Sequence, residues 1–172
     1  MTRAQPQLLS VAADNARVRN VLIVDDEPDI RGILAFTLED SGFEVREAAD
    51  GAEAIAALRA MPPDCLVLDL MMPGVDGFGV LRSRRQLGLA PETRILIVTA
   101  KTAERDYVRG WELGADEYLT KPFDPDHLVD KVRELLDTSL DELQARRETE
   151  LQKAELLERL ESAFSRPRVG PR

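Results

Sequence analysis

Four short runs of mainly apolar residues, each followed at once by polar ones, constrain the fold of this chain most strongly. Runs rich in Val, Ile and Leu are typical of strands buried on both faces of a parallel sheet. Polar residues that follow such strands lie at the carboxyl edge of the sheet, where open α/β sheets bind ligands. The runs and the residues that follow them are 21–24 with Asp25 and Asp26, 65–68 with Asp69, 95–98 with Thr99 and Ala100, and 117–120 with Lys121 and Pro122.

The segments between these runs have the features of helices. After Pro28, a residue favoured in the first turn, the apolar residues Ile30, Ile33, Leu34 and Leu38 recur at helical spacing until Gly42. Residues 43–48 supply a further strand. Strands that alternate with helices predict right-handed crossovers and a parallel sheet with helices on both faces. Three carboxylates, a hydroxyl and an amine at one edge of that sheet would form a pocket for a hard cation and an anion.

The ordered set of motifs resembles the receiver domain of bacterial two-component response regulators, over about residues 20–137. In that family an acidic pair follows the first strand, a phosphate-accepting Asp the third, Thr or Ser plus Ala the fourth, and Lys-Pro the fifth. Here Thr99 and Lys121 lie 30 and 52 residues after Asp69, and these separations are similar to those of the family. The resemblance implies a doubly wound α/β fold with a five-stranded parallel sheet in the order 2-1-3-4-5. That order brings the three carboxylates side by side at the topological switch point.

The resemblance also implies a metal site and its ligands. Mg²⁺ prefers oxygen ligands, keeps several waters and is usually held by one or two carboxylates together with phosphate oxygens. We expect Asp26 and Asp69 to bind Mg²⁺ directly and Asp25 to bind it through water. The backbone carbonyl of Met71 is expected to complete the share of the protein.

The remaining site residues receive roles in phosphoryl transfer from the same resemblance. Asp69 is expected to accept the phosphoryl group, and since a carboxylate is a weak nucleophile, catalysis depends on positioning and charge neutralisation. Lys121 would pair with Asp69 before transfer and with a phosphoryl oxygen afterwards, and Thr99 would donate its hydroxyl to another oxygen. Tyr118 matches the family's switch position, which is coupled to movement of Thr99. The peptide bond before Pro122 is expected to be cis.

Charge and composition exclude several classes of function. Residues 20–137 carry 24 acidic and 13 basic side chains, a net charge of −11, which disfavours binding to bare nucleic acid or an anionic membrane. No stretch approaches 18 apolar residues. The single cysteine, Cys65, lies in a predicted buried strand and fits a reducing compartment. We therefore expect a cytoplasmic protein without membrane insertion or direct nucleic-acid contact.

The C-terminal segment predicts a helical extension. We divide the chain into a flexible leader (1–19), the receiver domain (20–137), an extended helix (138–164) and a disordered tail (165–172). Between residues 136 and 164 there is no Gly or Pro, and six of nine positions at 3.5-residue spacing are apolar. This pattern predicts an unbroken helix over residues 125–164 and a coiled-coil homodimer through Leu136, Leu140, Leu143, Leu157 and Phe164. The alternative is an amphipathic helix folded back on its own domain.

These features together predict a phosphorylation-dependent signalling switch. The protein would accept a phosphoryl group from a sensor histidine kinase or phosphotransfer protein and change its affinity for a downstream protein. It would catalyse only its own phosphorylation and dephosphorylation. About 35 residues follow the receiver, too few for a folded DNA-binding domain.

Two alternatives remain. The chain could be a receiver fragment of a longer regulator whose helix leads to an enzymatic effector, although the initial Met and polar end favour a stand-alone protein. A phosphatase of the haloacid dehalogenase type would also use an Asp nucleophile and Mg²⁺. That family carries an Asp-x-Asp motif, but Met71 and Glu27 stand two residues after Asp69 and Asp25.

Overall fold

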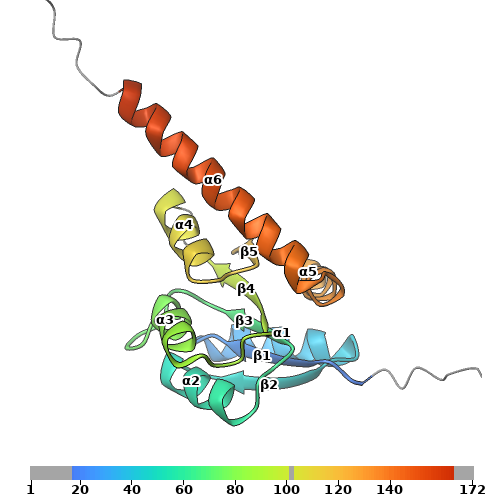
Figure 1. The fold of residues 1–172 in the computed structure, drawn as a ribbon. Helices are drawn as coiled ribbons and strands as arrows, with labels where there is room; N and C mark the ends of the chain where they lie inside the picture. Colours follow the sequence, from blue (N-terminus) through green and yellow to red (C-terminus); the bar gives the residue numbers. More distant parts are fainter. Residues whose placement is uncertain (1–16, 101–102, 165–172) are drawn as a thin grey trace, which may run out of the picture.

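A computed structural model describes residues 17–100 and 103–164 and shows an α/β domain with a long helix at its C-terminal end (Figure 1). The predicted disordered tail and most of the predicted leader lie outside these residues. The strands are β1 (Asn20–Val24), β2 (Glu44–Ala48), β3 (Cys65–Leu68), β4 (Arg94–Thr99) and β5 (Glu117–Thr120). The helices are α1 (Pro28–Asp40), α2 (Gly51–Ala60), α3 (Gly77–Leu87), α4 (Glu104–Glu112), α5 (Pro125–Asp137) and α6 (Leu140–Phe164).

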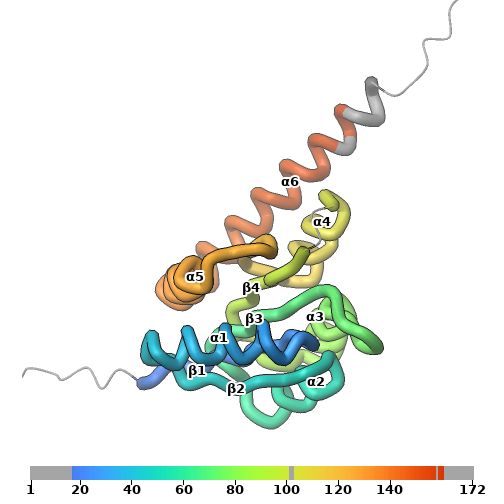
Figure 2. Tube along the Cα trace, turned by 180° about the vertical axis from the view of Figure 1, so that it is seen from behind, coloured from blue at the N-terminus to red at the C-terminus, as the bar shows by residue number. Residues whose placement is uncertain are grey.

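The five strands form one parallel sheet in the order β2-β1-β3-β4-β5, which confirms the predicted topology. Because alternate residues of a strand point to opposite faces, the sheet separates two apolar layers. One layer packs against α1 and α5, and the other against α2, α3 and α4 (Figures 1 and 2). The strands β1 and β3 are buried along their whole length, so their carboxyl ends meet at the middle of one sheet edge.

The C-terminal region differs from the predicted unbroken helix. The prediction of one helix over residues 125–164 is wrong, because α5 ends at Asp137 and the next residue, Thr138, has an extended backbone (φ −85°, ψ 136°). Ser139 then starts a second helix. Its hydroxyl accepts a hydrogen bond from the amide of Glu142 (3.3 Å), and the Glu142 carboxylate accepts one from the amide of Ser139 (3.1 Å). This reciprocal pair is a capping box, and it lets α6 leave in a new direction.

The first half of α6 folds back on its own domain, as the alternative reading of this segment holds. Leu143 is 1% exposed and belongs to the same core as Leu136, which is 6% exposed. Both residues were expected in an intermolecular seam, and that expectation is corrected because the domain core already buries them. Leu140 and Leu157 are 40% and 48% exposed. The side chain of Phe164 lies outside the described residues.

Within the described residues, none of the helices combines the length and the apolar character needed to cross a lipid bilayer.

The burial of Leu143 predicts a large effect on stability. Leu143→Ala should lower the free energy of unfolding by about 2–5 kcal/mol, because truncation leaves a cavity in a packed core. The matched control, Leu140→Ala, removes a 40% exposed side chain one turn earlier in the same helix. It should cost less than about 1 kcal/mol. Denaturant unfolding of both variants measures the difference, and equal costs would contradict the docking of α6 on the domain.

Candidate functional site

Three carboxylates converge where β1 and β3 end. Asp25 and Asp26 follow β1, and Asp69 follows β3, so the parallel pairing of these strands places them together. One carboxylate oxygen from each residue lies within 4.8 Å of the others. Asp25 and Asp69 are buried, and Asp26 is partly exposed. The predicted cluster is therefore formed, with its open side at Asp26.

Lys121 lies between two of the carboxylates. Its amine donates to Asp25 Oδ2 at 2.8 Å and to Asp69 Oδ2 at 3.1 Å, and it lies 3.8 Å from Glu27. Burial alone would lower the pKa of this amine, but the hydrogen bonds to Asp25 and Asp69 and their negative charges raise it overall. Lys121 is thus held in its charged form. The contact with Asp69 was predicted from the sequence, whereas the contact with Asp25 was not.

Asp69 is held in one orientation by the loop that follows it. Its Oδ1 accepts a hydrogen bond from the amide of Met71 (3.0 Å), while its Oδ2 faces Lys121. Burial raises the pKa of the Asp69 carboxyl, and the charge of Asp25 adds to this, although the Met71 amide and Lys121 act in the opposite sense. The ionised form of Asp69 is therefore disfavoured by its surroundings, and a further cation nearby would stabilise it.

A close backbone approach fixes the same loop. A Cβ atom on Gly77, the first residue of α3, would lie 2.4 Å from the carbonyl oxygen of Asp69 and 2.7 Å from the Cα of Leu70. Only glycine fits between these backbone atoms. The preceding residue, Asp76, caps α3 by accepting a hydrogen bond from the amide of Gly79 at 2.7 Å. The start of α3 therefore positions the acidic loop.

The donor set fits a hard divalent cation. Three carboxylates with a single lysine amine among them carry excess negative charge, and their oxygens are ligands of the type that Mg²⁺ prefers. Met71 is 53% exposed, and the role of its carbonyl oxygen as a metal ligand stays a prediction. Its backbone amide is already used by Asp69.

Thr99 and Pro122 lie at the neighbouring strand ends. Thr99 ends β4, is 1% exposed, and is paired in register with Thr120 of β5. Ala100 follows it and is exposed, while the next two residues lie outside the described part of the chain. The peptide bond between Lys121 and Pro122 is cis. The sheet thus gathers the residues that the sequence motifs named at one edge.

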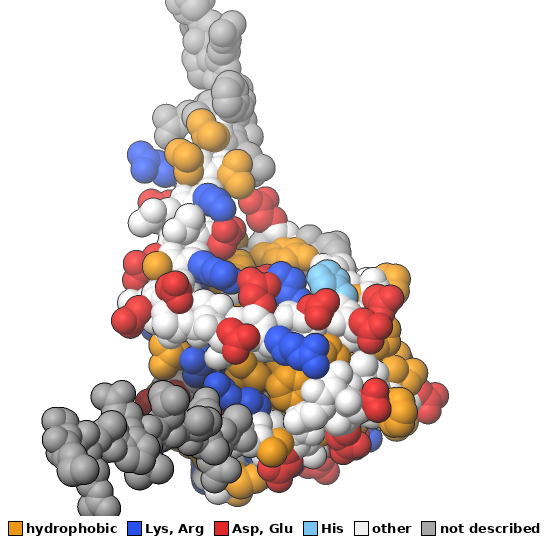
Figure 3. Space-filling view, turned by 90° about the vertical axis from the view of Figure 1, so that its right-hand side faces the viewer, with side chains coloured by type: hydrophobic (Ala, Val, Ile, Leu, Met, Phe, Trp, Pro, Cys, Tyr) orange, Lys and Arg blue, Asp and Glu red, His pale blue; other side chains and the backbone are white. Residues whose placement is uncertain are grey.

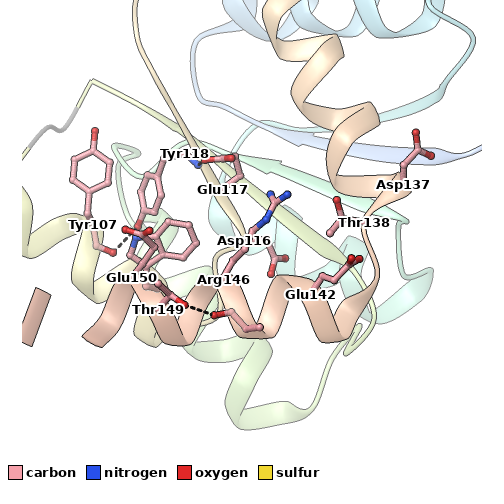
Figure 4. A pocket seen from close by; sticks show the side chains of 12 residues that line it. Tyr107, Asp116, Glu117, Tyr118, Asp137, Thr138, Glu142, Arg146, Thr149 and Glu150 are labelled. Carbon is pink, nitrogen blue, oxygen red and sulfur yellow. Dashed lines mark hydrogen bonds between the residues drawn. The ribbon is translucent and has the colours of Figure 1, made fainter. Parts of the chain in front are cut away.

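Tyr118 belongs to an aromatic cluster that sequence reasoning did not identify. Its ring lies 4.6 Å from that of Tyr107 and 5.3 Å from that of Trp111, centroid to centroid. Its hydroxyl donates to the α4 carbonyls of Tyr107 (3.1 Å) and Asp106 (3.3 Å), and burial raises its pKa. The cluster forms one wall of a cavity whose other wall is α6 (Figure 4). The residues of β5 and α6 are far apart in the sequence, so no local sequence pattern could predict this cavity.

Comparison with known proteins identifies the family. Residues 21–133 match the family model of the response regulator receiver domain. The chain is 44% identical over 118 residues to the alkaline phosphatase synthesis transcriptional regulatory protein PhoP of Bacillus subtilis, covering 69% of this chain and 48% of that protein. It is 37% identical over 118 residues to the phosphate regulon transcriptional regulatory protein PhoB of Escherichia coli, covering 69% and 52%. The chain thus spans about half the length of these curated relatives.

Solved structures agree with this assignment. A putative response regulator from Chloroflexus aurantiacus is 37% identical with a TM-score of 0.65, covering 71% of this chain and all of that one. The response regulator TrrA of Thermotoga maritima, in complex with Mg²⁺ and BeF, is 35% identical with a TM-score of 0.61, covering 69% and 99%. With the fold and the acidic edge already in place, these matches show that this chain belongs to the response regulator receiver domain family and carries a helix beyond that domain.

Proposed function

We propose that this chain is a phosphorylation-dependent switch whose phosphoacceptor is Asp69. The observation that carries the proposal is the position of Lys121, whose amine contacts Asp69 and Asp25 together. A carboxylate held by one amine and one backbone amide is fixed for attack on phosphorus. The donor would be the phosphohistidine of a sensor histidine kinase or phosphotransfer protein. The bond from Asp69 to phosphorus forms as the bond from phosphorus to the histidine nitrogen breaks.

Several groups of the site would stabilise the negative charge of the phosphoryl oxygens. The Lys121 amine can leave Asp69 for a phosphoryl oxygen while it keeps its contact with Asp25, and the Thr99 hydroxyl can donate to a second oxygen. Asp26 and Asp69 would hold Mg²⁺ directly, with Asp25 acting through water and Met71 through its carbonyl. When bound, Mg²⁺ supplies the positive charge that neutralises the phosphoryl oxygens. Catalysis by this chain is limited to its own phosphorylation and dephosphorylation.

The partners of the switch are proposed to be proteins in the cytoplasm. The net charge of −11 over residues 20–137 opposes direct contact with nucleic acid. The curated relatives PhoP and PhoB are named transcriptional regulators, but the shared stretch covers only about half of each. A longer regulator in which α6 leads to a further domain is therefore the second candidate, and the length difference is what favours it.

The phosphoacceptor assignment predicts a mass change. Acetyl phosphate with Mg²⁺ should add one phosphoryl group, about 80 Da, to the intact chain. Asp69→Asn should abolish the adduct, because an amide cannot form the acyl phosphate. Asp76→Asn is the control, since Asp76 caps α3 on the loop that follows and should keep the adduct. An undiminished adduct on Asp69→Asn, read by intact-protein mass spectrometry, would place the nucleophile elsewhere.

The proposed ligand set predicts a loss of metal affinity. Asp26→Asn removes one of two direct carboxylates, so Mg²⁺ should bind roughly tenfold more weakly or worse. Isothermal calorimetry on the full chain measures the affinity. Asp29→Asn neutralises an exposed carboxylate in the first turn of α1 and should leave the affinity unchanged. If the two variants bind Mg²⁺ equally well, Asp26 is not a ligand.

The distal part of α6 is proposed to form a homodimer. Leu156, Leu157 and Leu160 are 58%, 48% and 46% exposed. Hydrophobic side chains gather on this part of the helix, while charged ones of both signs cover the lower part (Figure 3). An apolar stripe on a projecting helix is typical of a helix-pairing surface, and the same stripe on a second copy would cover it.

Sedimentation of the full chain tests this pairing. Replacing all three leucines with Gln should convert a dimer to a monomer at tens of micromolar, since each pairing layer is lost. The control replaces Ile33 and Phe36 of α1, which are 52% and 72% exposed, with Gln. It should sediment as the parent chain does. A monomeric parent chain, with and without phosphodonor, would overturn the proposed dimer.

A further inference from the structure

The first half of α6 occupies a surface of its own domain made by α4 and β5. Leu151 and Ala154 of α6 line a groove together with Val108 and Arg109 of α4. The two helices run side by side in both views of the chain (Figures 1 and 2). Together with the buried Leu143, these contacts make α6 an internal partner for this surface.

An arginine of α6 anchors the helix there. Arg147 donates to the carbonyl oxygen of Ala115 at 3.0 Å and forms an ion pair with Oδ1 of Asp116. The second oxygen of Asp116 accepts a hydrogen bond from the amide of Ile95 at 2.8 Å. Asp116 is 4% exposed, and buried charges need such partners. The carboxylate therefore ties α6 to β4 and to the start of β5.

The aromatic cluster lies directly between this anchor and the phosphorylation edge. A cavity of about 990 Å³ lies between Tyr107 and Tyr118 on one side and Arg146 and Thr149 of α6 on the other (Figure 4). Trp111 and Ala145 also line it. Tyr118 pairs in register with Ile97, two residues before Thr99. Because alternate strand residues share a face, Tyr118 and Thr99 lie on the same side of the sheet. Thr99 and the cavity that faces α6 therefore lie on the side of the sheet that carries Tyr118.

Gly110 of α4 leaves the space that the Tyr118 hydroxyl occupies, and we call this space the seat. A Cβ atom on Gly110 would lie 1.6 Å from that oxygen and 2.8 Å from the ring carbon that carries it. The hydroxyl fills the space that any other side chain would take. If Tyr118 adopts another rotamer, it loses its hydrogen bonds to the α4 carbonyls and changes the wall against which α6 packs.

We propose that phosphorylation of Asp69 releases the first half of α6 from the α4–β5 surface, with the Arg147–Asp116 pair as the latch. This inference rests on the proposed function and states what the switch moves. The occupant of the surface before phosphorylation is α6 of the same chain. After phosphorylation, both the α4–β5 surface and the inner face of α6 become available to a partner.

Hydrogen exchange on the full chain tests the release. Amides of residues 140–155 should exchange about tenfold faster after acetyl phosphate and Mg²⁺ than before, because loss of the latch raises the population of the open helix. Intact mass spectrometry of the same samples reports the adduct. An adduct without faster exchange overturns the release and leaves the phosphoacceptor in place. Absence of the adduct overturns the proposed function and the release with it.

Two variants separate the latch from the seat. Arg147→Met keeps the apolar stem and should give fast exchange without phosphodonor. Arg159→Met changes an exposed arginine farther along α6 and should match the parent chain.

Gly110→Ala should expel the Tyr118 hydroxyl and also speed exchange of α6. Its control, Gly32→Ala on α1, meets nothing within 4 Å. Unchanged exchange in Arg147→Met overturns the latch, and this variant decides the matter if Gly110→Ala fails to fold.

Discussion

The structure depends on the placement of three carboxylates around one amine at the edge of the sheet. Two of the carboxylates, Asp25 and Asp69, are buried, and each contacts Lys121 through one oxygen. Burying like charges together is costly unless cations or hydrogen-bond donors compensate. One lysine does not balance three carboxylates, so the edge keeps a net attraction for a divalent cation.

Buried strands and close backbone contacts hold the carboxylates in place despite this cost. The strands β1 and β3 lie in the middle of the sheet and are fully buried, so their ends cannot move apart without exposing the core. Gly77 packs against the carbonyl of Asp69, and the Met71 amide holds its carboxylate. On the β5 side, Tyr118 packs against the core and also borders a cavity whose other wall is α6. In the proposed switch, a change at the acidic edge would reach α4 and α6 through this side of the sheet.

The sheet order and the acidic edge could be predicted because their signals are local. A buried parallel strand reads as a continuous apolar run, and the residues after it must share one edge with those after its neighbours. The C-terminal helices were predicted less well. Spacing of 3.5 residues does not distinguish pairing with a second chain from packing on the same chain, so Leu143 was assigned to the wrong interface. The Ser139 and Glu142 capping box was a readable signal for the break between α5 and α6.

Other features have no local signal in the sequence. The contact between Lys121 and Asp25 joins residues 96 positions apart, and its length depends on side-chain rotamers. The seat of the Tyr118 hydroxyl on Gly110 arises only when α4 lies over β5. A glycine in a helix is ordinarily a weak point, and its use here becomes visible only in three dimensions. The pair of Arg147 with Asp116 likewise depends on where α6 docks.

The central claim is that Asp69, and none of its neighbours, carries the phosphoryl group. Reduction of the phosphorylated chain with borohydride converts an acyl phosphate on aspartate to homoserine, which peptide sequencing by tandem mass spectrometry can locate. Homoserine is expected at position 69 alone, in samples treated with phosphodonor and Mg²⁺. Homoserine at position 25 or 26, or a phosphate that survives reduction on the Thr99 hydroxyl, would contradict it.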